Sequence, residues 1–148
     1  MKLTVTFARV FGLLVLGFVV SISADRPLIA QAKSRAAEAP GAAARGEYLA
    51  TRVAMCVQCH SGRDSHGEII EGQKFRGGAI PFDSPYPGKE FASQAPNLAG
   101  LTGLTDDQVV TLLMTGVAPG RRAPRAPMPP FRMERSDAES IVAFLRTR

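Results

Sequence analysis

The sequence predicts an all-α domain in which three main helices are joined by long irregular loops. Helical signals occur in residues 44–54, 105–116 and 136–148, and no segment has the sustained alternation of apolar and polar residues that is typical of strands. The two longest connections, residues 61–104 and 119–130, are rich in glycine and proline. Helices are therefore expected to form most of the regular structure.

The first predicted helix covers residues 44–54 (ARGEYLATRVA) and follows a Pro-Gly pair, which breaks helices. Helical spacing would place Tyr48, Leu49 and Val53 on one inward face.

The second predicted helix has signals at both ends. Thr105 is followed three residues later by Gln108, which is the capping-box pattern, and the two aspartates between them favour the positive end of the helix dipole. Gly116 and then Pro119 would end the helix. Its predicted inward face consists of Val109, Leu112 and Leu113.

The third predicted helix repeats this pattern, with Ser136 and Glu139 as a second candidate capping box. Its predicted inward residues are Ile141, Phe144 and Leu145. Three short helices and two long loops bury little apolar surface for a domain of this size. A large apolar component is therefore expected to complete the core.

The N-terminus is basic and is followed by an apolar run of 13 residues, Val10 to Ile22. As a helix this run would span about 20 Å, less than the roughly 30 Å core of a bilayer. Residues 1–32 are therefore interpreted as a secretory signal peptide that is cleaved after Ala30-Gln31-Ala32. The alternatives are an uncleaved membrane anchor and a buried core helix.

With a signal or an anchor, the folded part lies outside the cytoplasmic membrane, which predicts a periplasmic protein. Residues 33–43 are alanine-rich and would form a flexible leader, so that residues 44–148 form one domain. The net charge is +5, and most of the basic residues are dispersed without interleaved aromatics. No binding of nucleic acid is expected.

Cys56 and Cys59 are the only cysteines in the chain, and His60, one of two histidines, follows directly. A Cys-x-x-Cys pair can form a redox dithiol, but the βαβ pattern of such proteins is absent here. It can also supply half of a zinc site, but no further cysteine exists and His66 is the only other histidine. Covalent attachment of haem needs no further ligand nearby and is the favoured interpretation.

In that interpretation the two thiols add across the vinyl groups of one haem, and His60 donates a ring nitrogen to the iron. Export agrees with it, because c-type haem is attached outside the cytoplasmic membrane. One covalently bound haem c would also supply the missing part of the core.

The other face of the iron needs a second ligand. Met128 is favoured, because prolines on both sides of it restrict the backbone and lower the entropy lost in presenting a flexible thioether. Met55 is too close to Cys56 in sequence, and Met114 and Met133 are interpreted as packing residues. His66 is interpreted as a solvated loop histidine.

Two protein ligands would keep small molecules away from the iron, and thioether ligation raises the reduction potential. This arrangement suits transfer of single electrons and no catalytic residue is expected, so the chain is predicted not to be an enzyme. Its partners would be redox proteins, with a periplasmic dehydrogenase as donor and an oxidase or another cytochrome as acceptor. The alternative is a haem-based sensor or ligand-binding protein in which Met128 is labile or absent from the iron.

Over residues 44–148 the order of these motifs resembles the class I cytochromes c, and more narrowly the single-haem modules associated with quinoprotein alcohol or aldehyde dehydrogenases. Besides the Cys-x-x-Cys-His motif, the matching segments are Gly46-Glu47-Tyr48-Leu49, Gly77-Gly78, Pro96-Asn97-Leu98 and Met128-Pro129-Pro130-Phe131. The multi-haem subunits of that group repeat the haem motif, whereas this chain has it once, which implies a single-haem carrier or a one-domain relative of those subunits.

The resemblance implies a fold in which the first and last helices cross, with Gly46 meeting Phe144. It also implies that Pro96, Asn97 and Leu98 contact the haem.

Four arginines surround Met128 in a stretch that contains no acidic residue, namely Arg121, Arg122, Arg125 and Arg132. One interpretation is a set of solvated loop charges. The other is a docking patch for an acidic redox partner, which would accelerate encounter and weaken with salt.

Overall fold

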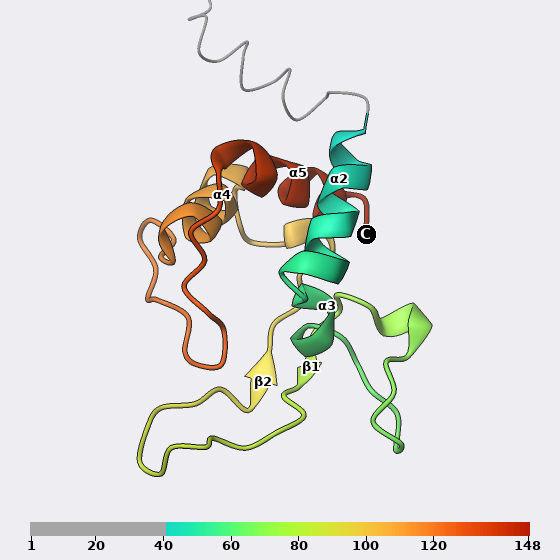
Figure 1. Ribbon diagram of the computed structural model, residues 1–148, viewed down its shortest axis with the longest axis vertical. Coiled ribbons are helices and arrows are strands. Elements are labelled where there is room, and N and C mark those ends of the chain that lie inside the picture. The colour runs from blue at the N-terminus through green and yellow to red at the C-terminus, as the bar shows by residue number, and fades with distance from the viewer. Residues whose placement is uncertain (1–40) are drawn as a thin grey trace, which may run out of the picture.

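A computed structural model of the chain describes residues 41–148 (Figure 1). The predicted signal peptide, residues 1–32, and most of the predicted leader lie outside the described residues. Within the described residues, no helix is long and apolar enough to span a membrane.

Helices form most of the regular structure in the described part of the chain. The main ones are α2 (Ala42–Tyr48), which continues into a π-helix (Leu49–Val53), α3 (Cys56–Cys59), α4 (Asp106–Thr115) and α5 (Arg135–Arg146). Two 3₁₀ turns span Glu71–Gln73 and Ala99–Leu101. The strands β1 (Gly78–Ala79) and β2 (Gln94–Ala95) pair antiparallel, with Gly78 opposite Ala95.

The three predicted main helices are present as α2, α4 and α5, and the long connections between them lie below these helices in Figure 1. The first helix begins at Ala42, two residues before the predicted start of the domain at residue 44. Gly41 precedes it with a left-handed backbone (φ 95°), so the last residues of the predicted leader already belong to the folded domain.

Helices α2 and α5 cross at very close range. A Cβ atom at Gly46 would lie 1.9 Å from the carbonyl oxygen of Ser140 and 2.9 Å from the Cβ of Phe144. The predicted contact between Gly46 and Phe144 is therefore present. The Phe144 ring also packs edge-on against the Phe75 ring, with 5.3 Å between their centroids.

The predicted inward face of the first helix is wrong in two of three positions. Leu49 is buried, but Tyr48 and Val53 are 54% and 55% exposed. The residues that face inward are small, with Ala42, Gly46 and Ala50 at intervals of four. Only small side chains let the α5 backbone approach this closely, and the π-helical turn then rotates Val53 away from the core.

The start and end of α4 match the prediction. The backbone N–H of Gln108 donates to Thr105 Oγ1 (3.2 Å), and the backbone N–H of Thr105 donates to Gln108 Oε1 (3.1 Å), which completes the capping box. Gly116 ends the helix with φ 83°. Val109 and Leu113 are buried, as predicted.

The capping box predicted for the last helix is wrong. Helix α5 begins at Arg135, so Ser136 already lies inside it, and no side chain caps its N-terminus. Glu139 is buried instead and pairs with Arg135 at 3.5 Å. The predicted inward residues are all buried, namely Ile141, Phe144 and Leu145.

This difference between the two helix starts is testable. Thr105→Ala removes a side-chain cap and is expected to cost about 1 kcal/mol of unfolding free energy. Ser136→Ala, which removes a hydroxyl with no capping role, is expected to change it by only a few tenths of a kcal/mol. Denaturant midpoints of the purified protein measure both, and equal losses from the two variants would contradict the assignment of the cap.

Candidate functional site

The two cysteines lie on α3, which is a single helical turn. Met55 precedes it with a left-handed backbone (φ 54°), which redirects the chain between the π-helix and α3. Residues three apart on a helix lie on the same face, so Cys56 and Cys59 point to the same side. Both are half-buried and neither forms a disulfide. The turn thus presents two free thiols side by side.

The environment of Cys56 suits a thiol that is not a free nucleophile. Burial raises the pKa of Cys56 to about 11, and the nearby Cys59 adds to the increase. At neutral pH very little Cys56 thiolate is present, whereas a redox dithiol needs a thiolate that attacks readily. This environment therefore counts against Cys56 as the attacking thiol of a redox dithiol.

The geometry also gives little support to the interpretation of the Cys-x-x-Cys pair as half of a zinc site. Within residues 41–148, no three side chains of the His, Cys, Asp and Glu types converge as ligands for a metal ion. A haem iron needs fewer ligands from the protein, because the porphyrin supplies four and the protein only one or two.

His60 is buried and has a defined tautomer. Its Nδ1 donates to the carbonyl oxygen of Pro96 at 2.8 Å, and because a carbonyl can only accept, Nδ1 carries the hydrogen and Nε2 keeps its lone pair. Burial lowers the pKa of His60, while the hydrogen bond to Pro96 opposes that change. A neutral, oriented imidazole is the form that binds a metal.

The Gly77-Gly78 pair holds the Pro96 carbonyl in place. The Gly77 N–H donates to the carbonyl of His60 at 2.9 Å, and a Cβ at Gly77 would lie 2.7 Å from the carbonyl oxygen of Ala95. At Gly78 a Cβ would lie 2.6 Å from the carbonyl oxygen of Ser61. Glycine is therefore required at both positions for the segment before Pro96 to pack against the segment after His60.

A cavity of about 360 Å³ borders α3 and is the centre of the site. Cys56, Cys59, His60 and Met128 all line it. Most of the other lining side chains are apolar and come from α4, α5 and the loops, including Leu98, Leu101, Val109, Leu112, Ile141 and Leu145. Its size and character are those of a site for an apolar small molecule or cofactor.

Backbone hydrogen bonds fix the loop that carries Met128. The Ala92 N–H donates to the Ala126 carbonyl at 2.7 Å, and the Met128 N–H donates to the Arg125 carbonyl at 3.2 Å. At the other end of the loop, a Cβ at Gly116 would lie 2.9 Å from the Cβ of Pro130, so the loop packs against the end of α4. Met128 is half-buried and lines the cavity, although 68 residues (128 − 60) separate it from His60.

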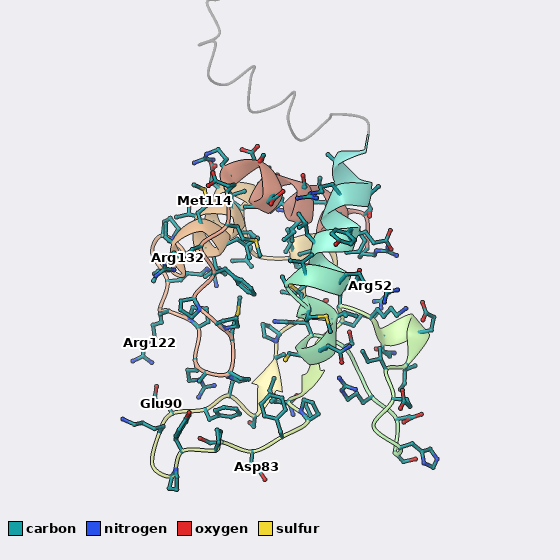
Figure 2. The ribbon with its side chains drawn as sticks, viewed as in Figure 1. Arg52, Asp83, Glu90, Met114, Arg122 and Arg132 are labelled. Atoms are coloured by element: carbon teal, nitrogen blue, oxygen red, sulfur yellow. The ribbon has the colours of Figure 1, made fainter. Side chains whose placement is uncertain are left out.

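The other candidate ligands lie elsewhere or are constrained. Met114 and Met133 pack against the hydrophobic core and do not line the cavity. Met114 belongs to α4 and is labelled in Figure 2. His66 is exposed in a turn in which its N–H donates to Asp64 Oδ1 (2.8 Å). Met55 lines the cavity but adjoins Cys56 in sequence.

The residues implied by the resemblance separate into two groups. Pro96 and Leu98 line the cavity, but Asn97 does not. The Oδ1 of Asn97 accepts a hydrogen bond from the Ala99 N–H at 2.8 Å and so stabilises the turn that follows. The expected contact of Asn97 with a haem stays a prediction, since the local turn engages only the Oδ1 atom of its side chain.

Arg63 makes contacts near the site that the sequence does not predict. Arg63 donates to the carbonyl of Gln58 (2.7 Å), to Gln58 Oε1 (2.9 Å) and to the carbonyl of Gly67 (2.6 Å), so it joins the following loop to α3. A single arginine in a loop is indistinguishable in sequence from a solvated charge. Its only signal is its position three residues after His60.

No protein-family model matches the chain, and no curated protein is significantly similar to it. Function is therefore inferred from the cavity and its side chains.

Proposed function

We propose that the chain is an exported, single-haem c-type cytochrome with a class I cytochrome c fold, which carries single electrons between a periplasmic dehydrogenase or membrane redox complex and an acceptor such as a terminal oxidase. One observation carries this proposal. The two thiols of α3, the ring of His60 and the thioether of Met128 all line a single apolar cavity.

Each of these side chains fits a role at a haem. Cys56 and Cys59 would hold the group through two thioether bonds, and their position on one helical turn suits attachment to a single haem edge. His60 would be the proximal ligand, since its Nδ1 is engaged with Pro96 and its Nε2 is available. Met128 would be the distal ligand. When bound, the haem supplies an iron that gains or loses one electron.

The rest of the cavity favours an electron carrier. Apolar walls disfavour the additional positive charge of the oxidised iron, and thioether ligation acts in the same direction, so a raised reduction potential is expected. Protein ligands on both faces leave no open position for a substrate, and the proposed role is therefore not enzymatic. A sensor or ligand-binding protein would instead need Met128 to leave the iron readily.

The proposed location and partners rest on the sequence. The pattern of residues 1–32 supports export to the periplasm, and a periplasmic carrier would exchange electrons with proteins of that compartment. An uncleaved N-terminal segment would add a membrane tether.

Substitution of Met128 tests the distal ligand. The oxidised wild-type protein is expected to have a low-spin c-type spectrum with a weak far-red band from methionine bound to iron. Met128→Ala is expected to abolish that band while the haem stays attached. Met114→Ala is the matched control, because Met114 packs against the core and does not line the cavity.

Absorption spectra of the oxidised proteins distinguish the alternatives. Loss of the band in His66→Ala but not in Met128→Ala would contradict the assignment of Met128. A high-spin wild-type spectrum would favour the sensor or ligand-binding protein.

A further inference from the structure

The four arginines around Met128 differ in what they contact. Arg121 donates to the carbonyl of Gly103 at 2.7 Å, and Arg132 donates to the carbonyl of Phe131 at 2.7 Å, so both hold the chain's own backbone. Within residues 41–148, the side chains of Arg122 and Arg125 have no hydrogen-bond or ion-pair partner. They are the two free cations of the group in the described part of the chain.

These two free arginines differ in position. Arg122 lies at the outer edge of its loop and points away from the domain (Figure 2). Arg125 is exposed to solvent and also lines the cavity. Its carbonyl accepts the Met128 N–H, so one tight turn places the Arg125 side chain and the proposed distal ligand at the same cavity. Arg125 therefore lies at the rim.

The cavity has almost no other charge or strong donor at its rim. Among the lining residues, only His60 and Arg125 have basic side chains, and only Arg125 carries a permanent charge. Gln94, on β2, is the other exposed polar residue of the lining. An unpaired guanidinium beside an apolar cavity is well suited to a ligand that is mostly apolar and carries a carboxylate at one edge.

A haem has this character, because its macrocycle is apolar and its two propionates are carboxylates. We propose that Arg125 binds a haem propionate and so determines which edge of the macrocycle faces the 119–130 loop. This inference rests on the proposed function and deepens it. Arg125 would act as a positioning residue, and its charge would offset the negative charge of the propionate near the iron.

The reduction potential tests this role, since a merely structural contact would leave it unchanged. Without the guanidinium, the uncompensated propionate favours the oxidised iron, so Arg125→Gln is expected to lower the potential. We expect about a tenfold change in the reduction equilibrium constant, which is about 59 mV for a one-electron couple. Arg125→Lys keeps the charge and is expected to recover most of the shift.

Arg122→Gln is the matched control, because it removes an equal charge from the same loop away from the cavity. Its potential is expected to equal that of the wild type. Equal potentials for Arg125→Gln and Arg122→Gln would overturn the role of Arg125. The comparison uses only proteins whose mass shows one attached haem. A wild-type protein whose mass shows no haem would overturn the proposed function as well, and the mass measurement distinguishes this outcome from a failure of the role of Arg125 alone.

A crystal structure of the wild-type holoprotein provides a readout that needs no variant. A guanidinium nitrogen of Arg125 within hydrogen-bond distance of a propionate oxygen would support the proposal. Both propionates directed away from Arg125 would overturn it.

Discussion

Replacing both Cys56 and Cys59 with serine is expected to leave the protein without covalently attached haem and largely unfolded. The cavity next to these residues is about 360 Å³, and an apolar void costs about 24 cal/mol per Å³. For a completely dry void this would amount to roughly 9 kcal/mol. The cavity opens to solvent at Arg125, so its cost without haem is below that upper bound, and it is set against a typical domain stability of about 5–15 kcal/mol.

Intact-mass measurement and far-ultraviolet circular dichroism of the purified protein test this prediction. Single substitutions of Cys56 or Cys59 are the matched controls. In each of them one thioether bond is expected to remain, so that a fraction of the protein molecules still carries haem. A double variant that carries covalent haem would contradict the role of the two thiols. A double variant that is folded and as stable as the wild type would contradict the role of haem in the core.

Gly46→Val is expected to destabilise the protein by about 3 kcal/mol or more, which is at or above the usual cost of overpacking a core. The reason is the helix crossing, where a Cβ at Gly46 would lie only 1.9 Å from the carbonyl oxygen of Ser140. The obstacle is the α5 backbone, which cannot rotate away as a side chain can. The helices would have to separate, and the contact with Phe144 would be lost.

Gly72→Ala is a suitable control for this experiment. A Cβ at Gly72 meets no atom within 4 Å, so its substitution is expected to change the stability by less than about 0.5 kcal/mol. Denaturant midpoints of the two variants provide the comparison. Similar midpoints would show that the tight crossing of α2 and α5 does not determine stability.

Local signals in the sequence predicted the helices well. The cap at Thr105 and the stop at Gly116 depend on residues within one helical turn of the helix ends, and both were found as expected. The same pattern failed at Ser136, because burial of Glu139 against the rest of the domain removed the partner that a capping box needs. Such burial is a tertiary effect that a pattern of four residues does not contain.

The inward face of α2 shows a similar limit. Hydrophobic spacing predicts Tyr48 and Val53 on the buried face. The close approach of α5 instead leaves room there only for small residues such as Gly46 and Ala50. Periodicity identifies where apolar side chains lie on a helix. It does not tell how close the neighbouring helix comes.

Some features of the candidate site also follow from local sequence signals, whereas others depend on tertiary contacts. The adjacency of Cys56, Cys59 and His60 follows from one short motif, and the proline-flanked Met128 had a signal of its own. The acceptor for His60 is a backbone carbonyl, which leaves no signal in a side chain, although the resemblance implies a role for Pro96 at the haem. The approach of the Met128 loop also depends on the hydrogen bond between Ala92 and Ala126, across 34 residues (126 − 92).

The central claim is that His60 and Met128 bind the two faces of one haem iron. Proton NMR of the reduced wild-type holoprotein tests it most directly, because the haem ring current shifts a methyl group held against the iron far upfield. We predict one strongly upfield-shifted methionine methyl signal, assigned to Met128, in a protein that carries one haem. Attached haem with all methionine methyl signals in their ordinary range would contradict the claim.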